Sequence, residues 1–152
     1  KYVFTAEWYD IPAASTANLI SEADWQTLIA VKSAANKHIE AARSAKLVGS
    51  NLSAKVELWA NAELKAVLDQ LGDELRFVLI TSQVLVNDFD GVQGEASDLE
   101  GLRVKVSAAD GEKCARCWHV LPDVNTHLAH PGLCARCIIN LPTGQGEERK
   151  YA

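Results

Sequence analysis

The sequence CARC occurs twice, at residues 114–117 and at residues 134–137, and the two copies contain all four cysteines of the chain. The complete pattern is C-x2-C-x16-C-x2-C, which falls within the spacing of four-thiolate zinc sites. Two residues between cysteines allow one tight turn to direct both sulfurs at a common point, and two such turns supply the tetrahedral set that zinc prefers. We therefore expect one zinc ion bound by Cys114, Cys117, Cys134 and Cys137. A complete thiolate set leaves no position for water, so the ion would be structural.

Other uses of four cysteines are less compatible with this sequence. Disulfides would require an oxidising compartment, which nothing else in the chain supports. A redox C-x-x-C pair would need a thioredoxin-like setting, which is not found. A rubredoxin-like iron centre uses the same ligands and stays open as an alternative. Because four thiolates complete the set, we expect the three neighbouring histidines to be surface residues; these are His119, His127 and His130.

The composition is that of a globular protein, with 48% hydrophobic and 23% charged residues among 152. No apolar run approaches the roughly 20 residues that span a bilayer, and no secretory leader opens the chain. We therefore expect no membrane association and a cytoplasmic location. The chain begins at Lys1 and has no methionine, which indicates a piece of a longer protein.

The charge is unevenly distributed along the chain. The formal net charge is −5, which argues against a broad basic surface for nucleic acid. Residues 1–110 hold 10 Lys and Arg against 16 Asp and Glu, whereas residues 111–152 hold 5 against 4. Contact with a polyanion should therefore favour the C-terminal part of the chain.

Apolar periodicity predicts the elements that precede the cysteines. Residues 1–20 read as an irregular connection. Ser21 is expected to cap a helix that runs to about residue 46 and is stopped by Gly49. Alternation predicts a strand over residues 54–60. A helix over 62–71, a helical turn over 74–79, and strands at 84–86 and 102–106 should follow, with an acidic exposed loop over 88–101.

This order predicts an α+β fold in which helices pack on a small sheet, followed by a small four-cysteine module of the zinc-ribbon or zinc-knuckle kind. We expect three parts. Residues 1–20 form the connection, residues 21–110 form the α+β unit, and residues 111–152 form the zinc module. The first helix of the unit could be the end of a preceding helical domain.

Several blocks of the sequence resemble one known family. The stretch from Gly111 to His119 (GEKCARCWH), the second CARC block and the ending GEERKYA are similar to the zinc-binding C-terminus of bacterial isoleucyl-tRNA synthetases. Upstream blocks resemble the same family's C-terminal third in the same order, including residues 4–9 (FTAEWY), 48–52 (VGSNL) and 71–77 (LGDELRF). Ser53, where the family often has glutamate, is a departure without functional consequence.

The resemblance implies a specific role. The parent enzyme would use ATP to activate isoleucine and attach it to isoleucine tRNA, and this region would help to dock the tRNA near its anticodon. The catalytic signatures of this class of synthetase, His-Ile-Gly-His and Lys-Met-Ser-Lys-Ser, are absent from the chain. We therefore expect no catalytic residues in it. The expected partners are isoleucine tRNA and the rest of the synthetase chain, in a monomeric enzyme.

Two other functions use the same four cysteines. DNA glycosylases of the formamidopyrimidine family end in a related zinc finger that binds DNA. The upstream blocks argue against that interpretation. A zinc ribbon that only binds another protein is the third possibility.

The residues expected to contact RNA lie in or beside the two cysteine turns and on the C-terminal tail. Planar guanidinium groups can bind a phosphate or a base edge through two hydrogen bonds, and an exposed tryptophan can stack on a base. Trp118 could equally fill the interior of the small module, and the arginines could pair with nearby carboxylates such as those of Asp123, Glu147 and Glu148. The candidates are Lys113, Arg116, Trp118, Arg136, Arg149 and Lys150.

Overall fold

The computed structural model describes residues 2–7, 10 and 19–151. Most of the predicted connection over residues 1–20 therefore lies outside the described residues. Its described part includes one 3-10 turn, η1 (Val3–Thr5).

Helix α1 (Glu22–Ser44) begins where the sequence predicts. The Ser21 hydroxyl accepts a hydrogen bond from the Asp24 amide at 3.0 Å, which satisfies one amide of the first turn. The predicted apolar stripe is buried from Leu28 onward, whereas Trp25 is half-buried. The helix ends earlier than expected. Lys46 adopts a left-handed conformation (φ 59°), a role that glycine usually fills, so the helix stops before Gly49 is reached.

The sheet has four strands in the order β2-β1-β4-β3. The central strand β1 (Ala54–Ala60) pairs in parallel with β2 (Gln83–Asp88) and antiparallel with β4 (Leu102–Ala108). The edge strand β3 (Glu95–Ala96) is only two residues long. The three longer strands were predicted, with β2 and β4 extending two residues beyond the predicted ends; β3 falls inside the segment predicted to be a loop.

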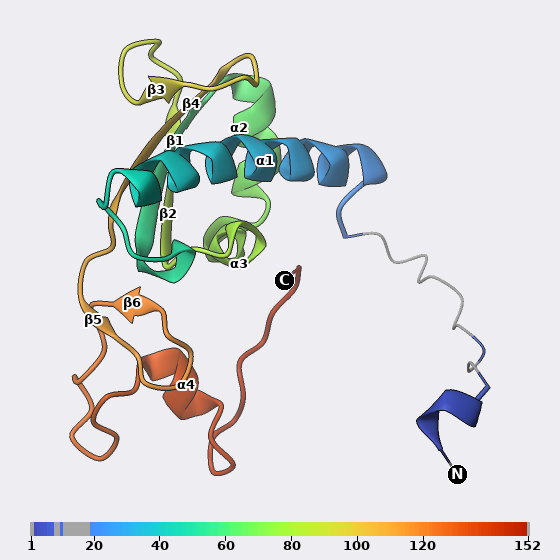
Figure 1. Ribbon diagram of the computed structural model, residues 1–152, viewed down its shortest axis with the longest axis vertical. Helices are drawn as coiled ribbons and strands as arrows, with labels where there is room; N and C mark the ends of the chain where they lie inside the picture. The colour runs from blue at the N-terminus through green and yellow to red at the C-terminus, as the bar shows by residue number, and fades with distance from the viewer. Residues whose placement is uncertain (1, 8–9, 11–18, 152) are drawn as a thin grey trace.

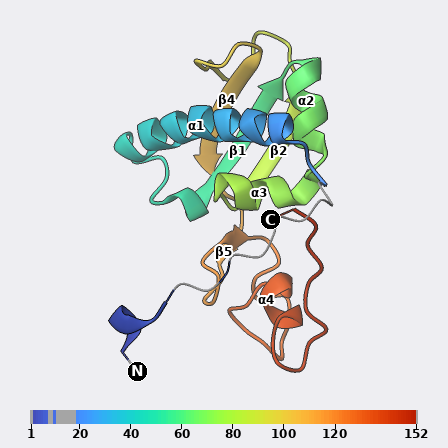
Figure 2. The same ribbon diagram turned by 90° about the vertical axis from the view of Figure 1, so that its right-hand side faces the viewer.

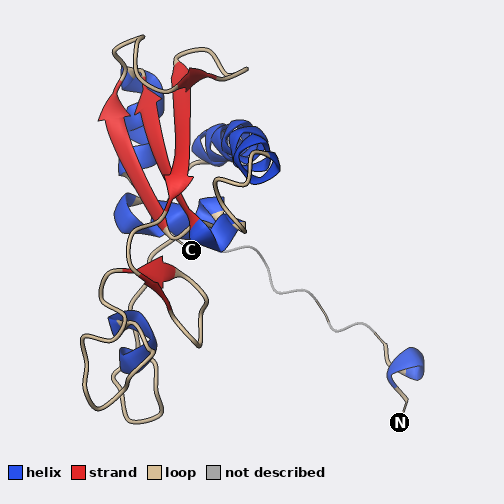
Figure 3. Cartoon of the chain, turned by 60° about the vertical axis from the view of Figure 1, so that its left-hand side comes forward, coloured by secondary structure: helices blue, strands red, loops and turns tan. Residues whose placement is uncertain are grey.

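One face of this sheet carries the helices, as Figure 3 shows. Alternation along β1 places small and branched apolar side chains on the helical side and Lys55 and Glu57 on the other. The buried side chains of α1 and β1 join those of β4 and the two short helices in a single hydrophobic core. The largest fully buried members of this core are Leu28, Ile39, Leu58, Leu68, Leu75 and Leu79.

The connection from β1 to β2 supplies the other two helices. Asn61 caps α2 (Ala62–Asp69) by accepting a hydrogen bond from the Leu64 amide at 2.9 Å. A 3-10 turn, η3 (Gly72–Glu74), then leads into α3 (Leu75–Leu79). The predicted helical turn over residues 74–79 is thus present, and α3 lies at the end of the unit that faces the cysteines (Figure 1).

The predicted exposed loop over residues 88–101 has an ordered part that covers the other face of the sheet. Trp59 is only 5% exposed, since Gly94 lies against its ring. Gly94 has a φ of 73°, and an added Cβ would come within 3.0 Å of that ring. The Arg103 guanidinium secures the loop by donating to the carbonyls of Gln93 and Gly94.

The region that contains the cysteines lies beyond the end of β4 (Figures 1 and 2). It consists of a two-stranded ribbon, β5 (Glu112–Lys113) with β6 (Val120–Leu121), and the short helix α4 (Ala135–Ile139). These three elements were not predicted. The sequence correctly predicts an α+β fold with a small zinc-binding knuckle, the part of the chain that contains the four cysteines. The predicted boundary between the α+β unit and the zinc module at residue 110 stays a prediction.

Candidate metal centre

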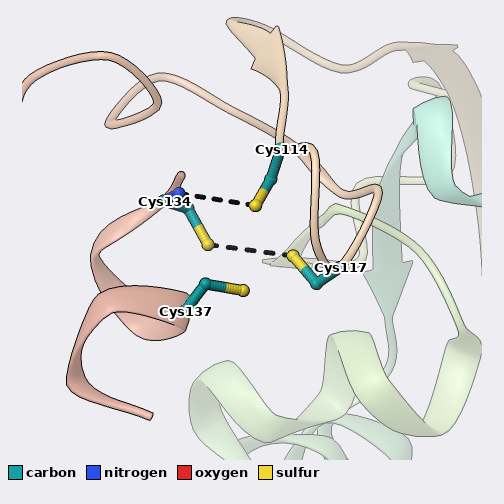
Figure 4. A group of neighbouring side chains, drawn as sticks. All are labelled: Cys114, Cys117, Cys134 and Cys137. Carbon is teal, nitrogen blue, oxygen red and sulfur yellow. Dashed lines mark hydrogen bonds between the residues drawn. The ribbon is translucent and has the colours of Figure 1, made fainter. Parts of the chain in front are cut away.

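The four cysteines converge from two turns. Cys114 follows β5 and Cys117 lies in the turn before β6, whereas Cys134 caps α4 and Cys137 lies within that helix. Figure 4 shows the four side chains pointing toward one another. Among the residues that the structure describes, this is the one group of three or more His, Cys, Asp or Glu side chains arranged to hold a metal ion.

The geometry of the sulfurs fits zinc. All four Sγ atoms lie within 4.8 Å of one another, and the Cys117 and Cys134 sulfurs are 3.7 Å apart. Tetrahedral coordination at a Zn–S distance of about 2.3 Å requires sulfurs about 3.8 Å apart. Cys114, Cys134 and Cys137 are buried and Cys117 is partly buried, so the cluster can exclude water. No disulfide joins these four cysteines, which removes the disulfide alternative for this structure.

Backbone amides favour the thiolate form of one cysteine, Cys114. Burial would raise the pKa of Cys114, but amide donors from Cys117, Cys134 and Arg116 outweigh it and lower the pKa of that thiol to about 6. The Cys134 amide, for example, lies 3.4 Å from the Cys114 sulfur. Burial raises the pKa of Cys134 and of Cys137. A cation at the centre would favour their thiolate forms, because thiolates are the species that bind zinc.

Polar side chains in the connection between the two cysteine pairs hold the two turns together. Asp123 accepts a hydrogen bond from the Ala135 amide at 2.7 Å, at the beginning of α4. Asn125 has a φ of 68°; its side chain accepts from the Gly132 amide and donates to Glu112. Neither positioning role was predicted from the sequence. The only available signal was the tendency of Asp and Asn to bond nearby backbone groups in turns.

The expectation that the three histidines are surface residues is wrong for His119. That side chain is 8% exposed and its ring lies edge-on to the Phe77 ring, with the ring centres 6.0 Å apart. Burial, together with the charges of Arg136 and Arg76, lowers the pKa of His119. His127 is exposed and His130 is half-buried. No histidine belongs to the described sulfur cluster.

Three of the six candidate RNA contacts lie together on the first cysteine turn. Trp118 is 59% exposed and has a left-handed backbone (φ 66°), and the Lys113 ammonium lies 5.7 Å from the centre of its ring. Arg116 is exposed, and its guanidinium donates to the Cys137 carbonyl at 3.4 Å. The alternative in which Trp118 fills the interior of the module is therefore not what the structure shows.

The other three candidates already have partners within the chain. Arg136 and Arg149 both pair with Glu147, at 3.1 Å and 2.6 Å. The Arg136 side chain is only 20% exposed. Lys150 is exposed, and its ammonium lies 4.8 Å from the centre of the Tyr151 ring.

Comparison with known proteins also indicates a zinc site in this part of the chain. Residues 111–139 match a family described as the zinc finger found in FPG and IleRS. Over all 152 residues the chain is 76% identical to the isoleucine–tRNA ligase of Acinetobacter baylyi. It is 47% identical to the isoleucine–tRNA ligase of Saccharophagus degradans over 99% of the chain, and 44% identical to that of Actinobacillus pleuropneumoniae over the whole chain.

The chain matches the region of isoleucine–tRNA ligases that contains the zinc finger.

The chain spans 16% of the length of these isoleucine–tRNA ligases. The match extends through residues 1–110, upstream of the zinc finger that the two named families share. This distribution confirms the resemblance to isoleucine–tRNA ligases and disfavours the glycosylase interpretation. None of the described helices is both long and apolar enough to cross a bilayer.

Proposed function

We propose that this chain is the tRNA-docking part of an isoleucine–tRNA ligase, in which a structural zinc ion fixes a surface that contacts the tRNA near its anticodon. The whole enzyme would attach isoleucine to its tRNA with ATP, and its active site would lie outside this chain. The similarity to isoleucine–tRNA ligases along all 152 residues supports this proposal, as does the matching zinc-finger family.

In this proposal Cys114, Cys117, Cys134 and Cys137 hold the metal. Zinc would supply a crosslink between two turns that share few apolar contacts, since the local hydrophobic cluster consists mainly of the cysteines themselves. The set of four sulfurs has no open position, which suits a structural ion.

The first cysteine turn carries the proposed RNA-contact surface, which we define as Lys113, Arg116 and Trp118. All three side chains are exposed although they flank or separate the cysteines of one turn. An exposed indole beside an ammonium group offers a stacking face for a base and a contact for its phosphate. Because the turn is held by the metal, these side chains lose less entropy on binding than a mobile segment would.

Replacing Trp118 or Arg116 by alanine in the full-length enzyme should raise the Michaelis constant for tRNA. Stacking of one base on an aromatic ring contributes about 1–3 kcal/mol, which corresponds to a roughly 5- to 150-fold change. Isoleucine-dependent pyrophosphate exchange should stay unchanged, because that reaction takes place elsewhere in the enzyme. Steady-state aminoacylation at varied tRNA concentration measures the first effect.

Leu128→Ala is a matched control, since Leu128 is 98% exposed and lies in the same module. This variant should keep the wild-type Michaelis constant. The proposed surface would have to be abandoned if Trp118→Ala and Arg116→Ala retained zinc and folded normally yet aminoacylated tRNA with wild-type kinetics.

A further inference from the structure

The last described residues return from the zinc knuckle to helix α3 (Figures 1 and 2). We call residues 147–151 the C-terminal strap. The Glu74 carboxylate accepts hydrogen bonds from the backbone amides of Lys150, at 2.7 Å, and of Tyr151, at 2.6 Å. The Tyr151 side chain packs against the main hydrophobic core. The strap therefore has a built docking site on the α+β unit.

A single aromatic ring joins three segments at this site. The guanidinium carbons of Arg76, Arg136 and Arg149 lie 4.5, 5.2 and 4.4 Å from the centre of the Phe77 ring. These arginines belong to α3, to α4 of the zinc knuckle and to the strap. The face of an aromatic ring attracts cations, so Phe77 is the common contact of all three segments.

Glu147 supplies the charge that such an arrangement needs. Its carboxylate accepts hydrogen bonds from Arg136 at 3.1 Å and from Arg149 at 2.6 Å, and its side chain is only 16% exposed. The Asn140 side chain, just after α4, accepts from the Glu147 amide and donates to the Arg136 carbonyl. The strap and α4 are therefore fastened to each other as well as to Phe77.

Arg136 connects this arrangement with the metal centre. It lies between two of the four cysteines, Cys134 and Cys137, and its side chain is only 20% exposed. A metal bound by those cysteines would fix their arrangement and, with it, the position of α4, which contains Cys137. In the assembled arrangement the guanidinium of Arg136 reaches both Phe77 and Glu147.

We propose that metal binding and docking of the C-terminal strap are energetically coupled through Arg136, Glu147 and Phe77. The strap therefore docks on the α+β unit when the metal centre forms. Metal binding then orders residues 147–151 and sets the orientation of the knuckle on α3. Arg136 and Arg149 then act inside the protein, whether or not the chain binds RNA.

Coupling of this kind is reciprocal: the factor by which zinc tightens strap docking equals the factor by which strap docking tightens zinc binding. The test uses the zinc-loaded full chain and two readouts. Hydrogen exchange of peptides that cover residues 147–151 reports strap docking. Competition with a chromogenic chelator reports the zinc dissociation constant.

Chelation should increase the exchange of the Lys150 and Tyr151 amides. Phe77→Leu retains an apolar side chain but loses the aromatic face, and it should open the strap and weaken zinc binding by about 5-fold or more, the usual range of a coupling between sites. Phe77→Tyr retains the face and should restore both properties. Glu147→Gln, which removes the bridging charge with little change of shape, should act in the same direction as Phe77→Leu.

Asp69→Asn is the control, because it removes an ion pair between Lys65 and Asp69 on α2, away from the strap; it should change neither readout. The proposal is overturned if the strap stays protected after chelation. It is also overturned if Phe77→Leu and Glu147→Gln open the strap while the zinc dissociation constant stays at the wild-type value, or if Phe77→Tyr behaves like Phe77→Leu.

Discussion

Removal of zinc is expected to unfold residues 111–152 while the α+β unit remains folded. The local cluster around the cysteines contains only three further apolar side chains, Val124, Leu121 and Leu133, so burial contributes little to the knuckle by itself. Binding of a structural zinc by comparable peptides contributes about 10–16 kcal/mol. This free energy is larger than the burial of so small an apolar cluster can supply once the zinc is removed. The α+β unit keeps its own core of helices and strands.

Hydrogen exchange before and after chelation measures this effect peptide by peptide. Cys134→Ser should reproduce the result of chelation without a chelator, and the purified wild-type protein should contain about one zinc per chain. His127→Ala is the control, because His127 is exposed and lies outside the sulfur cluster, and it should retain the metal. Simultaneous opening of both regions would show that they form one cooperative unit.

Truncation of Leu58 to alanine is expected to destabilise the α+β unit by about 2–5 kcal/mol. Leu58 lies on the central strand β1, is fully buried, and contributes to the core shared by the sheet and the helices. The loss combines the transfer free energy of the removed carbons with the cavity that they leave. Denaturant unfolding followed by circular dichroism measures it as a lower midpoint.

Leu85→Ala provides the matched control. Leu85 lies on the neighbouring strand β2, but it is 47% exposed on the face of the sheet opposite the helices. The same chemical change should therefore lower the free energy of unfolding by only about 0.5 kcal/mol or less. Equal destabilisation by the two substitutions would contradict the assignment of the helices to a single face.

The elements that the sequence predicts well are those long enough for their hydrophobic pattern to repeat several times. Helix α1 shows its stripe along most of its 23 residues, and β1 shows clear alternation, because each has one face in the core. The spacing of the cysteines likewise predicts the cluster, since each C-x2-C turn is a local structure. In these regions the local pattern and the tertiary packing point to the same answer.

The features that the sequence does not predict depend on contacts between distant residues. Strands β5 and β6 have two residues each and α4 has five, too few to show a period. The burial of His119 depends on the Phe77 ring, which belongs to another part of the chain. The strap depends on Glu74, which is 76 positions before Lys150. An isolated carboxylate and an isolated aromatic residue carry no sign of these roles.

The RNA candidates show the same limit. All six share charge or aromatic character and a position near the cysteines or on the tail. Sequence alone does not distinguish Arg116, which is exposed, from Arg136, which occupies the same position in the second CARC block and is paired with Glu147. That difference arises because Arg136 contacts the Phe77 ring of α3 and Glu147 of the strap, which lie far from it in the sequence.

The proposed contact between the first cysteine turn and isoleucine tRNA can be tested by comparing binding affinities at one fixed salt concentration. The dissociation constants of the zinc-loaded full-length protein and of its Trp118→Ala variant would be measured for isoleucine tRNA, for a different tRNA and for duplex DNA, because affinity for nucleic acid depends steeply on salt. We predict that the wild-type protein binds isoleucine tRNA most tightly and that the substitution weakens this complex selectively. The proposed contact is refuted if duplex DNA binds at least as tightly as isoleucine tRNA, or if the variant keeps the wild-type affinity for that tRNA.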